Sequence, residues 1–249
     1  MSALKGFWKL TWVETKVFIR EPMGVIATLG FPVLIFVVLG RMLGTGQVGA
    51  VSSQEPPFNV PVLAALVIAV NAVISLVAII SIYREGGILK RLRATPLSPV
   101  TILGSQVVIK LAFTVISLAL LVLAGRQFLP GAMDVNLVSF TLALVLGTLS
   151  ILSLGFLIAS VVPTARFAQP ITAAFLYPMI ALSGLFFPLD QLPPTMWALT
   201  QVLPTTHAVS LMLGVWEGSG WGAHWGNALA LLAILGACTA LSPRVFRWE

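Results

Sequence analysis

Two long apolar stretches, Val60–Ile82 and Ile102–Ala124, enclose a short segment that is rich in charge. The first has no charged residue, and the second has one, Lys110. Each is long enough to cross the roughly 30 Å hydrocarbon core of a bilayer, which takes about 20 helical residues. The segment between them, Tyr83–Pro99, is too polar to lie in hydrocarbon, so it must face water and fix the topology of both flanking helices. We therefore expect an integral membrane protein.

Composition agrees with this interpretation. Of the 249 residues, 58% are hydrophobic and 9% are charged, against about 25% charged in an average soluble domain. The single cysteine, Cys238, excludes an internal disulfide and a thiolate metal site. Both histidines fall on the predicted outer side, and no metal site is expected. The net charge of +6 is explained by the sorting of cations across the membrane, so we expect no nucleic-acid partner.

The whole chain is predicted to be an all-α integral membrane protein, with 1–249 forming a single transmembrane domain. Pro32 is expected to kink the first span, and Pro178 and Ser183-Gly184 are expected to interrupt the fifth. The six predicted transmembrane helices are Gly24–Leu43, Val60–Ile82, Ile102–Ala124, Leu137–Val162, Pro170–Phe187 and Trp221–Leu241.

Residues 1–21 are predicted to form an amphipathic helix that lies in the headgroup layer. At about 100° per residue, four cations share one narrow arc and several apolar side chains share another. The helix should end at Arg20-Glu21-Pro22, because proline disfavours helix in the preceding residue. The alternative is that these cations only flank a first span. The cations are Lys5, Lys9, Lys16 and Arg20, and the apolar face includes Leu4, Phe7 and Phe18.

Residues 188–220 contain no lysine or arginine, and their apolar pieces Met196–Leu203 and Thr205–Trp216 are too short to span. We expect extracellular re-entrant helices here, between spans five and six. With the N-terminus inside, the outer side holds only Arg41 and Arg126 as cations, and the remaining lysines and arginines of the loops lie inside. The prediction is a multi-pass protein of the cell inner (plasma) membrane with both termini cytoplasmic.

A membrane enzyme or an ion-coupled transporter usually needs ionisable groups in the middle of the membrane. Away from the ends of the predicted spans the only such group is Lys110, which is expected to reach back to the inner headgroups. The chain also lacks the G-x-x-x-x-G-K-[ST] loop that binds nucleotide phosphates. We therefore predict that the chain is not an enzyme, and that energy for transport would come from another polypeptide through Tyr83–Pro99.

Several motifs, loose one by one, occur in a specific order. They are Arg20-Glu21-Pro22, Arg84-Glu85, Gly87-Ile88-Leu89, Arg91-Leu92, Thr95-Pro96-Leu97-Ser98, Ser183-Gly184-Leu185-Phe186-Phe187-Pro188, Leu192-Pro193 and Leu203-Pro204. In this order the chain resembles the type-2 ATP-binding-cassette permeases, the transmembrane subunits of drug, lipo-oligosaccharide and polysaccharide exporters. The resemblance covers essentially the whole chain. One departure is the pair Gly86-Gly87, where a single glycine is expected and which is predicted to loosen the start of the loop.

The resemblance implies a dimer, with a second copy or a close paralogue, seated on two ABC ATPase subunits. ATP and Mg would bind to those subunits, and this chain would hold no cofactor. Residues 1–21 would be the connecting helix, and 83–99 the cytoplasmic coupling loop whose push moves the permease. A purely topogenic loop is the alternative. The implied ATPase-coupling residues are Arg84, Glu85, Gly86, Gly87, Ile88, Leu89, Lys90, Arg91, Leu92, Arg93, Thr95 and Pro96.

The resemblance also implies a substrate path at the dimer axis, between the second and fifth spans and in contact with membrane lipids. Its polar or aromatic candidates are Asn71, Ser75, Phe175 and Tyr177, each of which could equally serve helix packing. A path without fixed charge favours export of hydrophobic or amphipathic, drug-like or lipid-like compounds. Two alternatives stay open: an exporter of a lipid-linked oligosaccharide or polysaccharide, and a non-transporting membrane anchor or assembly subunit.

Overall fold

The computed structural model describes residues 3–44, 59–88, 99–128, 136–162, 164–186 and 189–245. Within these ranges the chain is helical and has no strand. The first half contains α1 (Ala3–Ile19), α2 (Pro22–Val25), the π-helical segment η1 (Ile26–Gly30), α3 (Phe31–Gly44), α4 (Val60–Glu85) and α6 (Pro99–Phe128). The second half contains α7 (Leu137–Val161), α8 (Ala165–Ala181), the 3-10 turn η2 (Leu189–Gln191), α9 (Pro194–Thr200), α10 (Pro204–Trp216), α11 (Gly220–Ala223) and α12 (Trp225–Val245).

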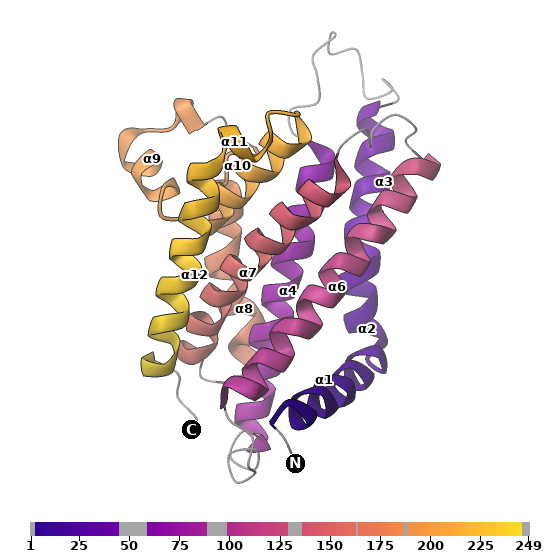
Figure 1. Cartoon of the computed structure of the whole chain (residues 1–249), viewed down its shortest axis with the longest axis vertical. Coiled ribbons are helices and arrows are strands. Elements are labelled where there is room, and N and C mark those ends of the chain that lie inside the picture. The colour runs from indigo at the N-terminus through magenta and orange to yellow at the C-terminus, as the bar shows by residue number, and fades with distance from the viewer. Residues whose placement is uncertain are drawn as a thin grey trace.

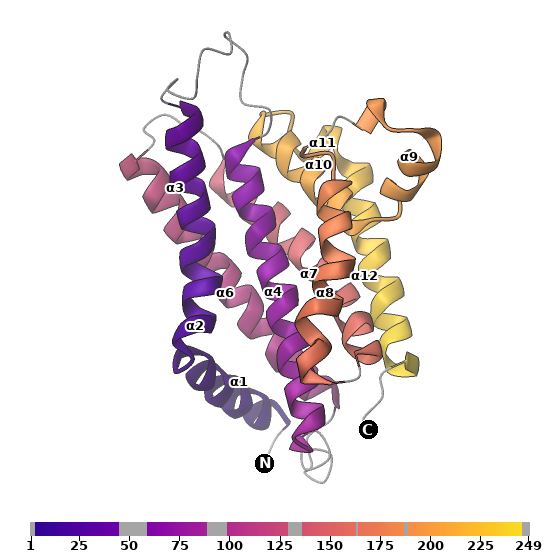
Figure 2. The same cartoon turned by 180° about the vertical axis from the view of Figure 1, so that it is seen from behind.

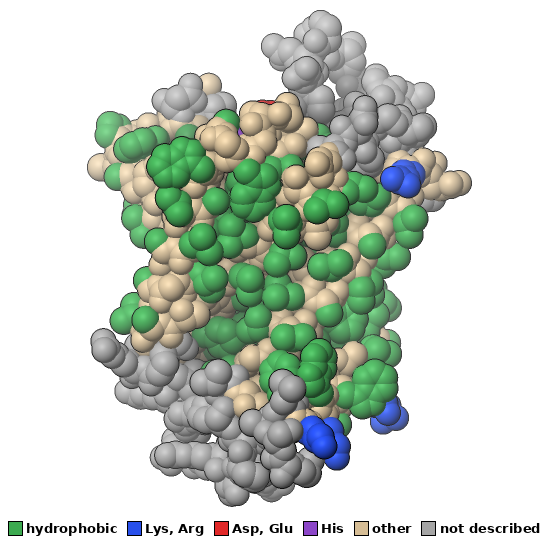
Figure 3. Space-filling view, viewed as in Figure 1, with side chains coloured by type: hydrophobic (Ala, Val, Ile, Leu, Met, Phe, Trp, Pro, Cys, Tyr) green, Lys and Arg blue, Asp and Glu red, His purple; other side chains and the backbone are tan. Residues whose placement is uncertain are grey.

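Four helical segments of the described chain are long and apolar enough to cross a membrane. They are Pro22–Met42, Val62–Glu85, Thr101–Gln127 and Leu137–Ser160. Hydrophobic side chains cover the middle of the face in Figure 3, and the visible lysines and arginines lie near its two ends. The prediction of an all-α membrane protein is therefore confirmed, while the count of six spans stays a prediction that depends on α8 and α12.

Both α8 and α12 run along the bundle beside the longer helices (Figures 1 and 2). The predicted bounds of the fifth span were wrong: α8 begins earlier, at Ala165, and ends at Ala181. Pro178 does not interrupt it, because the helix continues through this residue. The second predicted interruption, at Ser183-Gly184, is present: the chain turns at Gly184, whose φ of 85° lies in the left-handed region that favours glycine.

Helix α1 lies across the end of the bundle where the two chain ends N and C are found (Figures 1 and 2). It ends at Ile19, as the sequence predicted, and Pro22 then opens α2 at its first turn. Trp8 and Trp12 are exposed, whereas Thr11 and Glu14 are buried. This arrangement agrees with an amphipathic helix at an interface, with one face on the bundle and an aromatic face outside it.

The first span is irregular just before Pro32. The amide of Phe31 donates to the carbonyl of Ile26, five residues back, instead of to that of Ala27. Pro32 has no N–H, so the usual helical donor to the carbonyl of Thr28 is missing as well. Two successive carbonyls, those of Ala27 and Thr28, therefore lack their α-helical partners. The kink predicted at Pro32 takes the form of this π-helical turn.

Helix α7 forms the centre of the bundle and packs against α4, α10 and α12. Glycine allows two of these contacts. A Cβ atom on Gly155 would lie 2.9 Å from Cγ1 of Val73 in α4, and one on Gly147 would lie 2.9 Å from Cβ of Ala208 in α10. Small residues of this kind let membrane helices approach closely, where dispersion contacts rather than water exclusion hold them together.

At the opposite end from α1, α9 and α10 form a helix pair bent by 79° (Figure 1). The two short helices predicted in 188–220 are thus present. Helix α9 is largely exposed, while α10 is buried against α7 and α12. His207 of α10 lies 2.9 Å from the side-chain oxygen of Asn227 and 2.9 Å from the carbonyl oxygen of Gln201. These contacts fix α10 to α12 and to the end of α9.

Candidate functional site

The base of the predicted coupling loop is joined to the rest of the bundle by two neighbouring side chains. Arg84, in the last turn of α4, donates from its two terminal nitrogens to the carbonyl oxygens of Val162 (2.9 Å) and Ala159 (2.7 Å). These carbonyls lie at the C-terminus of α7. A cation there complements the negative end of the helix dipole.

Glu85 makes the complementary contact one residue later. Its carboxylate accepts a hydrogen bond from the amide of Ala165, at 2.8 Å, at the N-terminus of α8. Thr164, the residue in the N-cap position, makes no capping bond with its own side chain. A carboxylate at a helix N-terminus meets the positive end of the dipole. Arg84 and Glu85 together therefore tie α4 to both sides of the α7–α8 turn; we call these contacts the Arg84–Glu85 joint.

Helix α4 ends cleanly after this joint. Gly86 donates to the carbonyl of Ile82, and Gly87 donates to that of Arg84. Gly87 has a φ of 66°, the left-handed conformation that commonly ends helices. The second glycine of the pair is thus the residue that turns the chain at the end of α4. That the pair loosens the start of the loop stays a prediction, because 89–98 lie outside the described residues.

The remaining loop residues can be located only in part. Ile88 is described and exposed. Leu89, Lys90, Arg91, Leu92, Arg93, Thr95 and Pro96 lie outside the described residues. Their contact with an ATPase stays a prediction, as does that of Gly86, Gly87 and Ile88. For Arg84 and Glu85 the structure adds a role within the chain that the sequence pattern had not indicated.

A cavity of about 700 Å³ lies beside α1. It is lined by residues of α1, α2, η1, α3, α4, α6 and α8, and we call it the polar cavity. It brings together three of the four predicted substrate-path residues, Asn71, Ser75 and Tyr177. Phe175 is not among the lining residues and is 56% exposed on α8. The polar side chains of the lining belong to Glu14, Glu21, Thr28, Asn71, Ser75, Gln106, Lys110, Gln169 and Tyr177.

Asn71 has a structural role at the wall of this cavity. Its side-chain nitrogen donates to the carbonyl oxygen of Ala27 at 3.2 Å, and Ser117 of α6 donates to the carbonyl oxygen of Thr28 at 3.2 Å. These are the two carbonyls that lack their α-helical donors near Pro32. Side chains of two neighbouring helices thus satisfy the broken turn, as the interior of a membrane requires. The packing alternative for Asn71 is supported, and its position also faces the cavity.

Lys110 contradicts the sequence prediction. It was expected to reach the headgroups, yet it is 4% exposed and donates to the hydroxyl of Ser75. Its ammonium nitrogen lies 4.6 Å from the centre of the Phe18 ring, within cation–π range. The polar cavity itself contains charge, because Glu14, Glu21 and Lys110 all line it. That the substrate path has no fixed charge stays a prediction.

Glu14 was missed although its spacing gave a signal. Phe7, Glu14 and Phe18 recur at helical spacing, which places a carboxylate on the apolar face of α1. The structure buries this side chain to 9% exposure, and its carboxylate accepts a hydrogen bond of 2.5 Å from the hydroxyl of Tyr83. This bond holds α1 against the end of α4.

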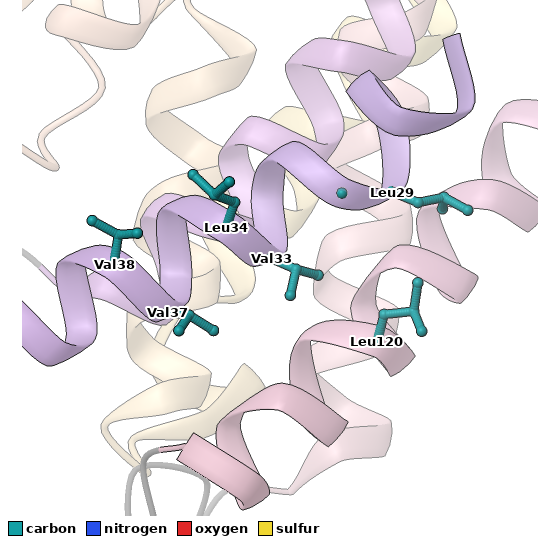
Figure 4. A pocket seen from close by; sticks show the side chains of 7 residues that line it. Leu29, Val33, Leu34, Val37, Val38 and Leu120 are labelled. Atoms are coloured by element: carbon teal, nitrogen blue, oxygen red, sulfur yellow. The ribbon is translucent and has the colours of Figure 1, made fainter. Parts of the chain in front are cut away.

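A second hollow, of about 470 Å³, lies between α3 and α6 and has no polar side chain in its lining (Figure 4). It suits a hydrocarbon chain and offers nothing that would recognise a headgroup. Within the described residues no group of three or more His, Cys, Asp or Glu side chains could hold a metal ion. The lining residues of this hollow are Leu29, Gly30, Val33, Leu34, Val37, Val38 and Leu120.

Comparison with known proteins gives one family. The "Inner membrane transport permease YhhJ" of Escherichia coli (strain K12) is 26% identical over 166 residues, which cover 66% of this chain and 44% of that protein. The protein of the same name from Shigella flexneri matches equally. The chain thus spans less than half the length of these relatives. The profile described as "ABC-2 type transporter" matches residues 5–216, from α1 through α10. This match covers most of the chain, so the chain belongs to the ABC-2 type transporter family.

Proposed function

We propose that the chain is the permease subunit of an ATP-driven exporter that moves hydrophobic or amphipathic, drug-like or lipid-like compounds out of the cytoplasm or the inner leaflet. It works as a homodimer or with a close paralogue, on two ABC ATPase subunits that bind ATP and Mg. It crosses the inner membrane six times, with both termini in the cytoplasm. Membership of the ABC-2 type transporter family supports the proposal.

The observation that carries the proposal is the Arg84–Glu85 joint. Helix α4 ends at Glu85 inside the loop 83–99, so a force on the rest of the loop reaches α4 through the backbone. It reaches α7 and α8 through the bonds of Arg84 to Val162 and of Glu85 to Ala165. Charge-assisted bonds of this kind are stronger than neutral ones. Three helices therefore move as one body, which a rigid-body transition driven from outside requires.

The polar cavity supports the choice of substrate class. Its volume of about 700 Å³ lies within the range of about 300–1,000 Å³ typical of small-molecule sites. Apolar side chains such as Phe31, Leu34 and Ile74 form much of its wall, together with a few polar groups. Such a wall suits compounds with both an apolar and a polar part.

The test is transport into vesicles that contain the chain and a partner ABC ATPase. We expect ATP-dependent movement of compounds from a panel of lipophilic drugs and glycolipids, together with substrate-stimulated ATP hydrolysis. Transport of glycolipids alone would favour the oligosaccharide exporter. Stimulated hydrolysis that does not depend on the chain would contradict the proposal and favour an anchor or assembly subunit.

Two variants test the coupling loop itself. Arg91→Glu and Leu92→Glu should each abolish co-purification with the ATPase, because they place a carboxylate on the predicted contact. Arg126→Glu is the matched control, since Arg126 is exposed in the last turn of α6, the end of the helix away from the loop. Unchanged co-purification of both loop variants would contradict the coupling role.

A further inference from the structure

The polar cavity contains hydrogen-bond donors that lack acceptors. Lys110 carries three N–H donors, and in the described part of the chain its contacts are one hydroxyl, that of Ser75, and the face of the Phe18 ring. Gln106, one helical turn before it on α6, is 4% exposed, and its side-chain nitrogen has no hydrogen-bond partner. A buried donor without an acceptor is unfavourable in apolar surroundings. The two side chains share one face of α6 and both line the cavity.

The same cavity is also lined by two carboxylates, which come from other parts of the chain than Lys110 and Gln106. Glu14 of α1 and Glu21, at the α1–α2 junction, both line it. Both lie close enough to interact electrostatically with Lys110, yet neither forms an ion pair with it among the described residues. Glu14 bonds Tyr83 and keeps lone pairs for a second donor. The lining of the cavity therefore includes hydrogen-bond donors on α6 and carboxylates on α1 and at the α1–α2 junction, around a volume of about 700 Å³.

We propose that the polar cavity binds the headgroup of a zwitterionic amphiphile, with its phosphate against Lys110 and Gln106 and its ammonium group against Glu14 and Glu21. A phosphate oxygen supplies the acceptor that both donors of α6 lack, and an ammonium group supplies donors to the two carboxylates. A purely anionic headgroup meets two carboxylates, and a purely cationic one leaves Lys110 and Gln106 without acceptors. The inference rests on the proposed function, since it names the compound class held at that cavity.

The hydrocarbon part has a place as well. Phe18, Ile26 and Ile109 are apolar residues of the same lining, and α1 beside it has the amphipathic pattern of a helix in the headgroup layer. An amphiphile can therefore enter from the leaflet on the α1 side with its chain still in the bilayer. By the proposed orientation this is the inner leaflet.

The experiment measures binding to the purified full chain in detergent, by native mass spectrometry, without ATPase or ATP. The probes are dioctanoyl phosphatidylethanolamine, dioctanoyl phosphatidylglycerol and octylammonium, which carry both charges, the anion alone and the cation alone. We expect the zwitterion to bind at least about tenfold more tightly than either of the others. Equal binding of all three, or tighter binding of phosphatidylglycerol or of octylammonium, overturns the proposal.

Two variants test which side chains hold the phosphate and which hold the ammonium group. Lys110→Met should remove the chain's preference for phosphatidylethanolamine over octylammonium. Glu21→Gln should weaken the chain's preference for phosphatidylethanolamine over phosphatidylglycerol. Glu21 is exposed, so this second variant keeps the fold even where Lys110→Met does not. The matched controls Lys16→Met and Glu217→Gln change exposed residues outside the cavity and should leave all three affinities unchanged. Preferences unaffected by both cavity variants overturn the inference.

The two proposals fail separately. Headgroup selectivity without ATP-driven transport contradicts the exporter and leaves the site intact. ATP-driven export of drugs by a chain that does not distinguish the three headgroups contradicts the site and leaves the exporter intact.

Discussion

The central helices α4 and α7 and the arm formed by α2, η1 and α3 are held in opposite ways. In an apolar window of 18 residues, 67% of residues are buried in α4 and in α7, against 17% in such a window of the arm, within Pro22–Met42. Glycine contacts such as Gly155 on Val73 bring the central helices together. The arm contacts α4 and α6, and its polar links include the bonds of Asn71 and Ser117 to its broken turn.

This difference indicates which changes each region tolerates. The central pair depends on shape, so added volume should destabilise it most. The arm exposes much of its apolar surface, including Ile26, Leu34 and Val38. In a membrane that surface meets lipid or another protein, so added volume matters less there. Loss of one polar link should act locally, on the turn before Pro32.

The largest effect is expected from Arg84→Met, at the end of the central pair. The change removes two charge-assisted hydrogen bonds and leaves the carbonyls of Ala159 and Val162 without this donor. We expect the free energy of unfolding to fall by about 3 kcal/mol, because such bonds are worth about 1.5–3 kcal/mol each and water at the helix end replaces part of them. Thermal unfolding in detergent, followed by tryptophan fluorescence, measures the loss.

Arg20→Met is the control for this change, since Arg20 is an exposed arginine at the end of α1. It should leave the free energy of unfolding within about 0.5 kcal/mol of that of the original chain. Equal losses for the two variants would show that the Arg84–Glu85 joint does not hold α4 to α7, and the rigid connection behind the proposed coupling would then be lost.

A second, smaller effect is expected from Gly155→Val. Its Cβ atom would lie 2.9 Å from Cγ1 of Val73, a short β-branched side chain that cannot move aside easily. We expect a loss of about 2 kcal/mol from overpacking. Gly236→Val on α12 is the matched control, because nothing lies within 4 Å of a Cβ atom there. Similar midpoints for both variants would contradict the close packing of α4 on α7.

The sequence predicted the membrane helices well because each is a long run of apolar residues, and that signal is local. It also placed the end of α1 correctly, since Pro22 restricts the residue before it. The predicted bounds of α8 were wrong because Pro170 was taken as the start of the helix and Pro178 as a break in it. Both lie inside the helix, where contacts with neighbouring helices override local preference.

The site was predicted less completely, for a physical reason. Asn71, Ser75 and Tyr177, which line the polar cavity, were singled out because a polar or aromatic residue stands out in an apolar span. Lys110 was given a surface role because a lysine near a helix end usually reaches water. Only the packing of α1 across the bundle, through the bond of Tyr83 to Glu14, encloses this lysine. That contact joins residues far apart in sequence, and periodicity along one helix does not reveal it.

The smallest effect separates the arm from the central pair most sharply. Ser117→Ala removes the donor to the carbonyl of Thr28, whose α-helical partner is missing because Pro32 has no N–H. We expect a loss of about 1 kcal/mol, the usual value of one hydrogen bond. Hydrogen exchange should rise at amides of 26–33 and stay unchanged in α7, because only the arm loses a contact.

Ser153→Ala is the matched control for this change. Ser153 is also buried, but its hydroxyl bonds the carbonyl of Ser150 in its own helix. The carbonyl of Ser150 still accepts the helical hydrogen bond from the amide four residues later in α7. Removing the Ser153 hydroxyl should therefore change the stability and the exchange rates little. If Ser117→Ala raised exchange throughout α7 as well, the arm and the central pair would unfold as one unit, and the contrast drawn between them would not hold.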